Sequence, residues 1–177
     1  MNNTKILIAS VLSALTFNAN AVHSEDDINK VLTSDLDKCF IAAHKKYGGN
    51  IVSLEREVDD GRGVYELDIN TKDGREIEVE CVIGTTELID EEVEVKKDDD
   101  AFNNAVKVSA EEAEKTALEN TPGKLVEREY AFEGDLPVYE FDIYSESIGH
   151  EVEVEINGVT GEIMETEIEI YDIGVDS

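Results

Sequence analysis

The sequence predicts an α+β protein of two tandem repeats, each an N-terminal helix packed on an antiparallel β-meander. Three observations support this prediction. A six-residue motif occurs twice, a helix signature precedes each occurrence, and strict alternation of apolar and acidic residues follows each helix. A period of two residues is typical of strands with two different faces, whereas a helix repeats its apolar face every three to four residues.

The duplication is visible in the order of the matching residues. Val-Tyr-Glu-Leu-Asp-Ile at residues 64–69 reappears as Val-Tyr-Glu-Phe-Asp-Ile at residues 138–143, and Gly49 matches Gly123 at the same offset. Several matches in one order and nearly one register indicate an internal repeat. We therefore expect repeats at residues 22–97 and 98–177, after a signal peptide at residues 1–21.

Each repeat is expected to begin with a helix. The first helix starts near Ser34 or Asp35 and ends at Gly48-Gly49, while the second follows the capping box Ser109-Ala110-Glu111-Glu112 and stops at Pro122-Gly123. Alternation then predicts strands over residues 52–58, 64–70, 76–82 and 87–95, and over residues 124–132, 138–144, 151–156 and 162–172. Residues 96–104 are the expected boundary between repeats. The two repeats either pack side by side or join edge strands into one continuous sheet, and the oligomeric state is open.

Charge narrows the classes of partner. The chain has 43 Asp and Glu against 15 Lys and Arg, a formal net charge of −28. Binding of nucleic acid or of an anionic membrane surface requires clustered basic residues, so the charge argues against nucleic acid and disfavours an anionic membrane surface as partners. The content of apolar residues in a regular pattern argues against disorder.

The N-terminus has the pattern of a secretory signal peptide. Lys5 precedes a short apolar stretch over residues 6–17, and Ala19-Asn20-Ala21 reads as a cleavage site. The stretch is too short for a membrane span of about 20 residues. We expect a periplasmic or secreted protein after cleavage near Ala21, without direct membrane insertion. A buried helix or an uncleaved anchor is the alternative.

Alternation places most of the acidic side chains on the faces of the two sheets that point away from the helices. One interpretation is a solvated, aggregation-resistant exterior. The other is a surface for a basic partner or for loosely held divalent cations. No acidic calcium-binding loop motif occurs, and we expect no bound cofactor or metal. The candidate partner surface consists of Glu66, Asp68, Glu78, Glu80, Glu140, Asp142, Glu153, Glu155, Glu165, Glu167 and Glu169.

The two cysteines occupy core-facing positions of the first repeat. Cys39 aligns with Ala113 on the helix, and Cys81 aligns with Ile156 on the third strand. Because the helix packs on that face of the sheet and an oxidising compartment permits the bond, we expect a Cys39–Cys81 disulfide. Two buried free thiols are the alternative.

Catalytic machinery is not evident in the sequence. His23, His44 and His150 are the histidines, and none belongs to a zinc-protease, nucleophile-elbow or nucleotide-binding motif. Carboxylate pairs are frequent, but strands exposed to solvent give no apolar pocket that would raise one pKa. We therefore predict a protein that is not an enzyme.

The second repeat resembles a PepSY domain. The resemblance rests on Val-Ser-Ala-Glu-Glu-Ala at residues 108–113, Pro-Gly-Lys-Leu-Val at 122–126, Pro-Val-Tyr-Glu-Phe-Asp-Ile at 137–143 and Asn-Gly-Val-Thr-Gly at 157–161. The first repeat looks like a diverged member, since it lacks the Ser-Ala-Glu-Glu start and the Asn-Gly turn. The resemblance covers residues 30–172. It implies a non-catalytic module with a helix on an antiparallel sheet, similar to modules in the propeptides of secreted metalloproteases.

Three functions are compatible with these observations. The first is an exported binding module that restrains or regulates a peptidase in trans, through an exposed strand edge or the acidic faces. The second is a periplasmic sensor or accessory domain for a membrane partner, responsive to divalent cations. The third is an acidic structural protein without a specific partner. No catalytic residues are carried over from the resemblance.

Overall fold

The computed structural model describes residues 33–174, which belong to the unit Thr33–Ser177. The signal peptide predicted at residues 1–21 lies outside the described residues, and the predicted repeat boundary between residues 97 and 98 stays a prediction. Within the described residues, no helix is both long and apolar enough to cross a membrane. The elements are α2 (Asp35–Tyr47), β1 (Asn50–Asp59), β2 (Arg62–Asn70), β3 (Glu76–Val82), β4 (Leu88–Glu94), α3 (Asp100–Ala105), α4 (Ala110–Asn120), β5 (Lys124–Leu125), β6 (Glu129–Glu133), β7 (Leu136–Glu140), β8 (Asp142–Ser145), β9 (His150–Asn157) and β10 (Ile163–Asp172).

Capping boxes start the two longer helices. At α2, the Ser34 hydroxyl accepts a hydrogen bond of 3.1 Å from the Asp37 amide, and the Asp37 carboxylate accepts one from the Ser34 amide. At α4, Ser109 and Glu112 make the same reciprocal pair. Each box satisfies amide groups that have no partner within the helix. Both predicted helix starts are confirmed.

Helix α3 lies in the segment that the sequence assigns to a boundary. Asp99 caps it by accepting a hydrogen bond of 2.9 Å from the Phe102 amide. Phe102 is 1% exposed, and its ring makes edge-on contacts with the rings of Tyr130, Phe132 and Tyr139. This short helix therefore anchors the connection between the two halves in the second core.

The first four strands form an antiparallel meander, with β1 paired to β2, β2 to β3 and β3 to β4. The second half departs from this simple pattern. The predicted strand at residues 124–132 is divided into β5 and β6, and the predicted strand at residues 138–144 is divided at Phe141 into β7 and β8. The pieces β5 and β8 pair with each other, whereas β6 pairs with β7 and also with β4 of the first half.

Eight strands form one closed antiparallel sheet, in the order β10-β1-β2-β3-β4-β6-β7-β9, and β10 returns to pair with β9. At one seam β1, the first strand of the first half, pairs with β10, the last strand of the second half; at the other, β4, the last strand of the first half, pairs with β6, which follows β5 in the second half. The predicted fold class is therefore wrong, because the strands of the two halves share one sheet and do not form separate helix-on-meander repeats. A separate meander would leave backbone groups of its outer strands unpaired, and the β4–β6 and β10–β1 pairings satisfy them.

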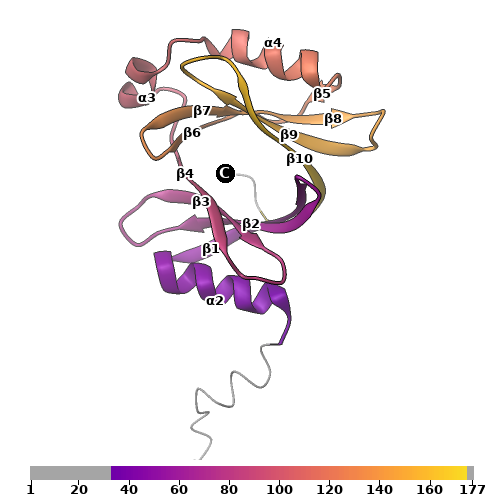
Figure 1. The fold of residues 1–177 in the computed structure, drawn as a ribbon. Coiled ribbons are helices and arrows are strands. Elements are labelled where there is room, and N and C mark those ends of the chain that lie inside the picture. Colours follow the sequence, from indigo (N-terminus) through magenta and orange to yellow (C-terminus); the bar gives the residue numbers. More distant parts are fainter. Residues whose placement is uncertain (1–32, 175–177) are drawn as a thin grey trace, which may run out of the picture. The chain divides into compact units, whose positions relative to one another are not determined.

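The helices lie outside the closed sheet, α2 against the first half and α3 and α4 against the second (Figure 1). Each half therefore has its own apolar core between helix and strands. The first core contains Cys39, Ala43, Leu54, Leu67, Ile69, Ile77, Val79 and Cys81. The second contains Phe102, Ala113, Ala117, Tyr139, Phe141, Ile143, Val152, Val154 and Ile156. The strand residues of both cores point outward to the helices. Their neighbours along each strand therefore point into the closed sheet.

Candidate functional site: an acidic interior and a cleft of mixed charge

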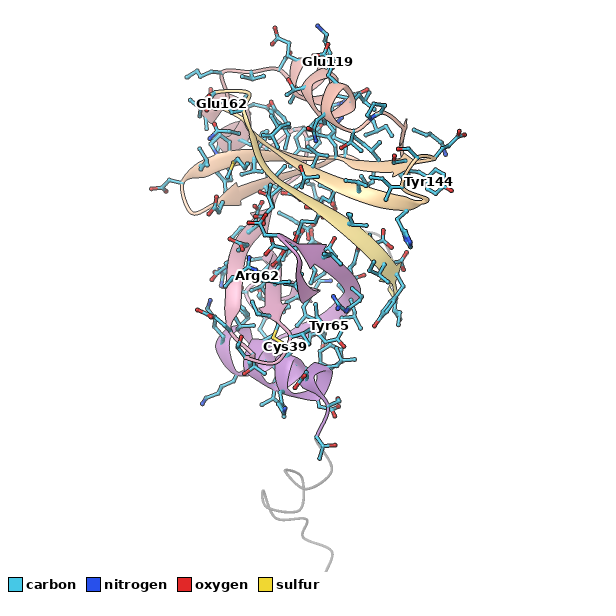
Figure 2. The ribbon with its side chains drawn as sticks, turned by 45° about the vertical axis from the view of Figure 1, so that its right-hand side comes forward. Cys39, Arg62, Tyr65, Glu119, Tyr144 and Glu162 are labelled. Carbon is cyan, nitrogen blue, oxygen red and sulfur yellow. A yellow bond between two sulfur atoms is a disulfide. The ribbon has the colours of Figure 1, made fainter. Side chains whose placement is uncertain are left out.

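Acidic side chains line the interior of the closed sheet. On β2, Leu67 and Ile69 pack beneath α2, so the alternating Glu66 and Asp68 point to the inner face. Side chains fill the space between the two halves (Figure 2). Alternation identifies the residues that share a face, but the structure places that face inside the sheet. Each member of the expected partner surface is buried or half-buried: Glu66, Asp68, Glu78, Glu80, Glu140, Asp142, Glu153, Glu155, Glu165, Glu167 and Glu169.

Four carboxylates from four strands converge at one point of the interior. Glu57 on β1, Glu66 on β2, Glu153 on β9 and Glu167 on β10 each have a carboxylate oxygen within 4.8 Å of those of the other three. Their exposed fractions are 0%, 6%, 8% and 2%, in that order. We call this set the four-carboxylate cluster. It joins the two halves, since two members come from each.

Sequence reasoning missed one member of the four-carboxylate cluster, Glu57. The signal was present, because Glu55 and Glu57 alternate with apolar Leu54 and Val58 in the manner of the acidic positions on the other strands. A bulge between Arg56 and Glu57 shifts the pairing of β1 with β10. The alternation alone therefore does not predict which residues of β10 lie beside Glu57.

Further groups of carboxylates extend from the cluster. Glu78, Glu140 and Glu153 come within 4.8 Å of one another, although β3 and β7 are separated in the sheet by β4 and β6. Side chains from opposite walls therefore meet inside the sheet. Two other groups share members with the cluster: Asp59, Glu80 and Glu167, and Glu66, Asp68 and Glu78.

Removal from water perturbs these carboxyl groups strongly. Burial raises the pKa of Glu57 to about 8 and the pKa of Glu155 to about 9; the charges of neighbouring carboxylates add to both effects, whereas the contact with the Glu66 carboxyl opposes the shift at Glu57. Burial likewise raises the pKa values of Glu66 and Glu153 well above the usual range, and Glu78 is a neighbouring charge for both. Desolvation and like charges both disfavour the ionised form of a carboxyl group, so the interior strongly favours neutralising partners.

The predicted disulfide is present at the opposite face of the first half. The sulfur atoms of Cys39 on α2 and Cys81 on β3 are 2.00 Å apart, and the two Cα atoms are 5.8 Å apart. Both residues are fully buried in the first core. The bond links the helix covalently to the sheet whose inner face carries Glu80.

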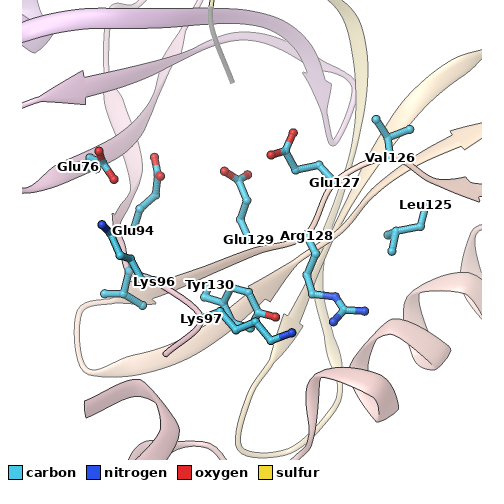
Figure 3. Close-up of a pocket in the computed structure, with 11 residues that line it drawn as sticks. Glu76, Glu94, Lys96, Lys97, Leu125, Val126, Glu127, Arg128, Glu129 and Tyr130 are labelled. Carbon is cyan, nitrogen blue, oxygen red and sulfur yellow. The ribbon is translucent and has the colours of Figure 1, made fainter. Parts of the chain in front are cut away.

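A cleft with a volume of about 690 Å³ opens between β5 and β6, where the single strand predicted at residues 124–132 is interrupted. Its carboxylates, including those of Glu94 and Glu129, lie along one side, while Lys97 and Arg128 point to another (Figure 3). Arg128 pairs with Glu114 of α4 and lies over the ring of Phe141, 5.7 Å from its centre. The complete lining is Glu76, Glu94, Val95, Lys96, Lys97, Leu125, Val126, Glu127, Arg128, Glu129 and Tyr130.

Two carboxyl groups of the cleft face the acidic side of the interior. Burial raises the pKa of Glu129 to about 9, and repulsion from the Glu94 carboxylate is the next largest cause. Burial, followed by the charge of Asp68, raises the pKa of Glu94 to about 7. A basic group entering the cleft would restore the ionised form of both. The cleft therefore offers apolar surface together with a wall of poorly solvated carboxyl groups that a basic ligand would ionise.

Comparison with known proteins identifies the family. The chain is 28% identical over 168 residues to the Bacillus subtilis (strain 168) protein YkoJ, which is described as uncharacterized, covering 92% of this chain and 94% of that protein. A crystal structure described as that of a "putative lipoprotein" from Clostridium difficile 630 is 20% identical, covers 78% of this chain and 94% of its own, and gives a TM-score of 0.35. The family model described as "Peptidase propeptide and YPEB domain" matches residues 42–81 and 107–167, more than half of the sequence. The chain therefore belongs to the PepSY family.

Proposed function

We propose that this chain is an exported, non-catalytic module that binds a peptidase in trans and restrains it. The observation that carries the proposal is the match of two separate regions to the peptidase-propeptide family model. The two matched regions contribute strands to one closed sheet, so a partner meets them as one surface.

The cleft between β5 and β6 is the proposed contact site. Its volume of about 690 Å³ lies in the range of ordinary ligand sites, and its lining combines apolar and charged groups. Val126 is 47% exposed at the rim, where it offers apolar contact to an arriving segment. A basic side chain of the peptidase would lie against Glu94 and Glu129 and would replace the lost hydration of these carboxyl groups.

Charge complementarity gives this proposal a salt dependence. The chain has a formal net charge of −28, and its excess of acidic residues accelerates encounter with a basic surface. Salt screens such attraction over about 10 Å at 0.1 M ionic strength. Binding is therefore expected to weaken as salt increases.

The test begins with capture and ends with a purified enzyme. The tagged protein is incubated with exported and membrane fractions of the host at low and high salt, and bound proteins are identified by mass spectrometry. A captured peptidase is then purified and assayed with increasing amounts of the protein. The proposal predicts inhibition that saturates with concentration and decreases at high salt.

Two variants locate the contact. Glu94→Gln/Glu129→Gln removes the two carboxyl groups of the cleft that a bound basic side chain would ionise, whereas Glu111→Gln/Glu119→Gln removes two carboxyl groups from the exposed side of α4. We expect the cleft variant to inhibit the peptidase less strongly and the α4 variant to act like the unmodified chain. Unchanged peptidase activity at a large molar excess of the protein would overturn the proposal. Capture of a membrane protein without any peptidase would favour the accessory role instead.

A further inference from the structure

We propose that a calcium ion binds inside the closed sheet, between the carboxylates of Glu57, Glu66, Glu153 and Glu167. This site is separate from the cleft and does not depend on the proposed restraint of a peptidase. It joins strands of both halves, since Glu57 and Glu66 belong to the first and Glu153 and Glu167 to the second.

The spacing of the four carboxylates fits a shared ion. One oxygen from each lies within 4.8 Å of one oxygen from each of the others. Calcium binds oxygen ligands at about 2.3–2.6 Å, so two ligands on opposite sides of one ion lie up to about 5 Å apart. Four strands thus present candidate ligands around a common centre.

Unpartnered carboxylate oxygens point into the same place. Both side-chain oxygens of Glu57 and Oε1 of Glu167 are inaccessible to water and accept no hydrogen bond from the protein. Glu57 is 0% exposed and Glu167 is 2% exposed. Among residues 33–174, no ion pair includes a member of the four-carboxylate cluster. Buried anionic groups are normally paired or coordinate a metal, and the groups that approach these oxygens are other carboxyl groups, Glu66 beside Glu57 and Glu80 beside Glu167.

The types of ligand favour calcium over softer metals. All four candidate ligands are carboxylates, which suit calcium, magnesium and manganese. In the described part of the chain, both cysteines are joined in the disulfide and both histidines, His44 and His150, are exposed. Magnesium requires a small octahedral shell and retains several waters, whereas calcium accepts many carboxylate oxygens in a flexible geometry. A closely packed interior lined by carboxylates therefore fits calcium better.

The test uses the protein freed of metal by a chelator. CaCl2 is titrated calorimetrically at constant ionic strength, and thermal unfolding is followed with and without calcium. We expect saturable binding of calcium and a higher melting temperature, because an ion bound only by the folded state stabilises it. An equal rise in melting temperature with NaCl of matched ionic strength would overturn the proposal, as would the absence of saturable binding up to about 10 mM calcium, beyond the weakest protein calcium sites.

Variants separate a specific site from general screening of charge. Glu57→Gln/Glu167→Gln replaces two proposed ligands by neutral groups of the same shape, and calcium affinity should fall by about tenfold or more. Glu111→Gln/Glu162→Gln removes the same number of carboxyl groups from exposed positions and should bind calcium like the unmodified chain. The ligand variant is expected to fold, because it removes repulsion from the interior, and its melting temperature without metal should rise. Equal calcium affinity for the ligand variant and the unmodified chain would overturn the proposal.

Discussion

The substitution Glu129→Gln should stabilise the protein at alkaline pH and leave it nearly unchanged in acid. Burial raises the pKa of the Glu129 carboxyl to about 9, from an ordinary value of 4.5, with Glu94, Asp142 and Glu127 adding repulsion. Between these two pH values the folded chain binds more protons at this group than the unfolded chain does. The stability associated with Glu129 is therefore complete below pH 4.5 and is lost as the pH rises toward 9.

The size of the effect follows from the same shift in pKa. One pKa unit corresponds to about 1.4 kcal/mol, so keeping Glu129 protonated at about pH 8 costs the folded state up to about 5 kcal/mol relative to acid. The Glu129 side chain is half-buried, so water screens part of the effect, and the repulsion from Glu94 depends on how far Glu94 is ionised. We therefore expect about half of this cost. Glutamine has the same shape and no proton to lose. The free energy of unfolding should therefore increase by about 2 to 3 kcal/mol at about pH 8.

Thermal unfolding in a chelator-containing buffer of constant ionic strength measures this difference. For a chain of this size, about 2 to 3 kcal/mol corresponds to a rise in melting temperature of about 5–10 °C. Near pH 4.5 the two proteins should melt within about 1 °C of each other. Glu119→Gln on the exposed side of α4 is the control, because the exposed pair of Glu119 with Lys115 contributes little. An equal offset at both pH values, or a lower melting temperature for the variant at about pH 8, would refute the reasoning.

Three further substitutions test the cores and caps, each by urea unfolding. Replacing Cys39 and Cys81 by Ala together should lower the free energy of unfolding by about 4 kcal/mol, since the bond closes a loop with a sequence separation of 42; an unchanged midpoint would contradict this entropic account. Phe102→Ala should lower the free energy of unfolding by about 3–5 kcal/mol, because three aromatic rings lose their partner. A decrease below about 1 kcal/mol would show that α3 contributes little to stability. Ser109→Ala should cost about 1 kcal/mol, whereas Ser109→Asp, which retains an accepting oxygen, should restore most of it.

Local patterns predicted the elements of the first half well. Alternation and turn residues placed strands at 52–58, 64–70 and 76–82, and the structure has β1, β2 and β3 at Asn50–Asp59, Arg62–Asn70 and Glu76–Val82. The capping box predicted the start of α4, because a cap is a contact between residues three apart, and the start of α2 was predicted near Ser34 or Asp35, where the structure shows a second capping box. Features that depend on residues a few positions apart can therefore be predicted from the sequence.

Elements that depend on distant partners were not predictable in the same way. The pattern at residues 124–132 reads as one strand, but its two ends pair with β8 and with β7 and β4. The chain must turn between them, and this turn forms the cleft. Phe102 carried a signal that was missed, since a capping Asp99 and one aromatic residue in an acidic segment are typical of a short anchored helix.

The position of the acidic face could not be decided from alternation. Period-two patterning assigns residues to two faces, and it is identical whether the polar face meets water or another polar face. The sequence-based interpretation placed the polar face on the outside of each sheet, away from the helix. Closure of the sheet at both seams overrides this placement, since pairing the outer strands and forming two apolar cores favour the closed state.

Closure has an electrostatic cost that is visible in the registers of the strands. Glu55 lies opposite Glu66 on the β1–β2 ladder, and Glu153 lies opposite Glu167 on the β9–β10 ladder. Like charges directly opposite are destabilising, and the loss of water inside the sheet strengthens their repulsion. At the β1–β10 seam Glu57 lies opposite Glu169, and Glu57 on β1 and Glu167 on β10 both belong to the four-carboxylate cluster.

A calcium ion on the four-carboxylate cluster would therefore act mainly on the β1–β10 seam. It would link Glu57 and Glu167 across this seam, whereas the β4–β6 seam contains neither residue. Hydrogen exchange should slow on addition of calcium for amides of residues 55–58 and 168–172 more than for amides of residues 92–94 and 131–133. In Glu57→Gln/Glu167→Gln the difference between the seams should disappear, because the link is lost while the backbone pairing stays. Equal slowing at both seams would indicate a general effect of calcium on stability, without preferential action on the β1–β10 pairing.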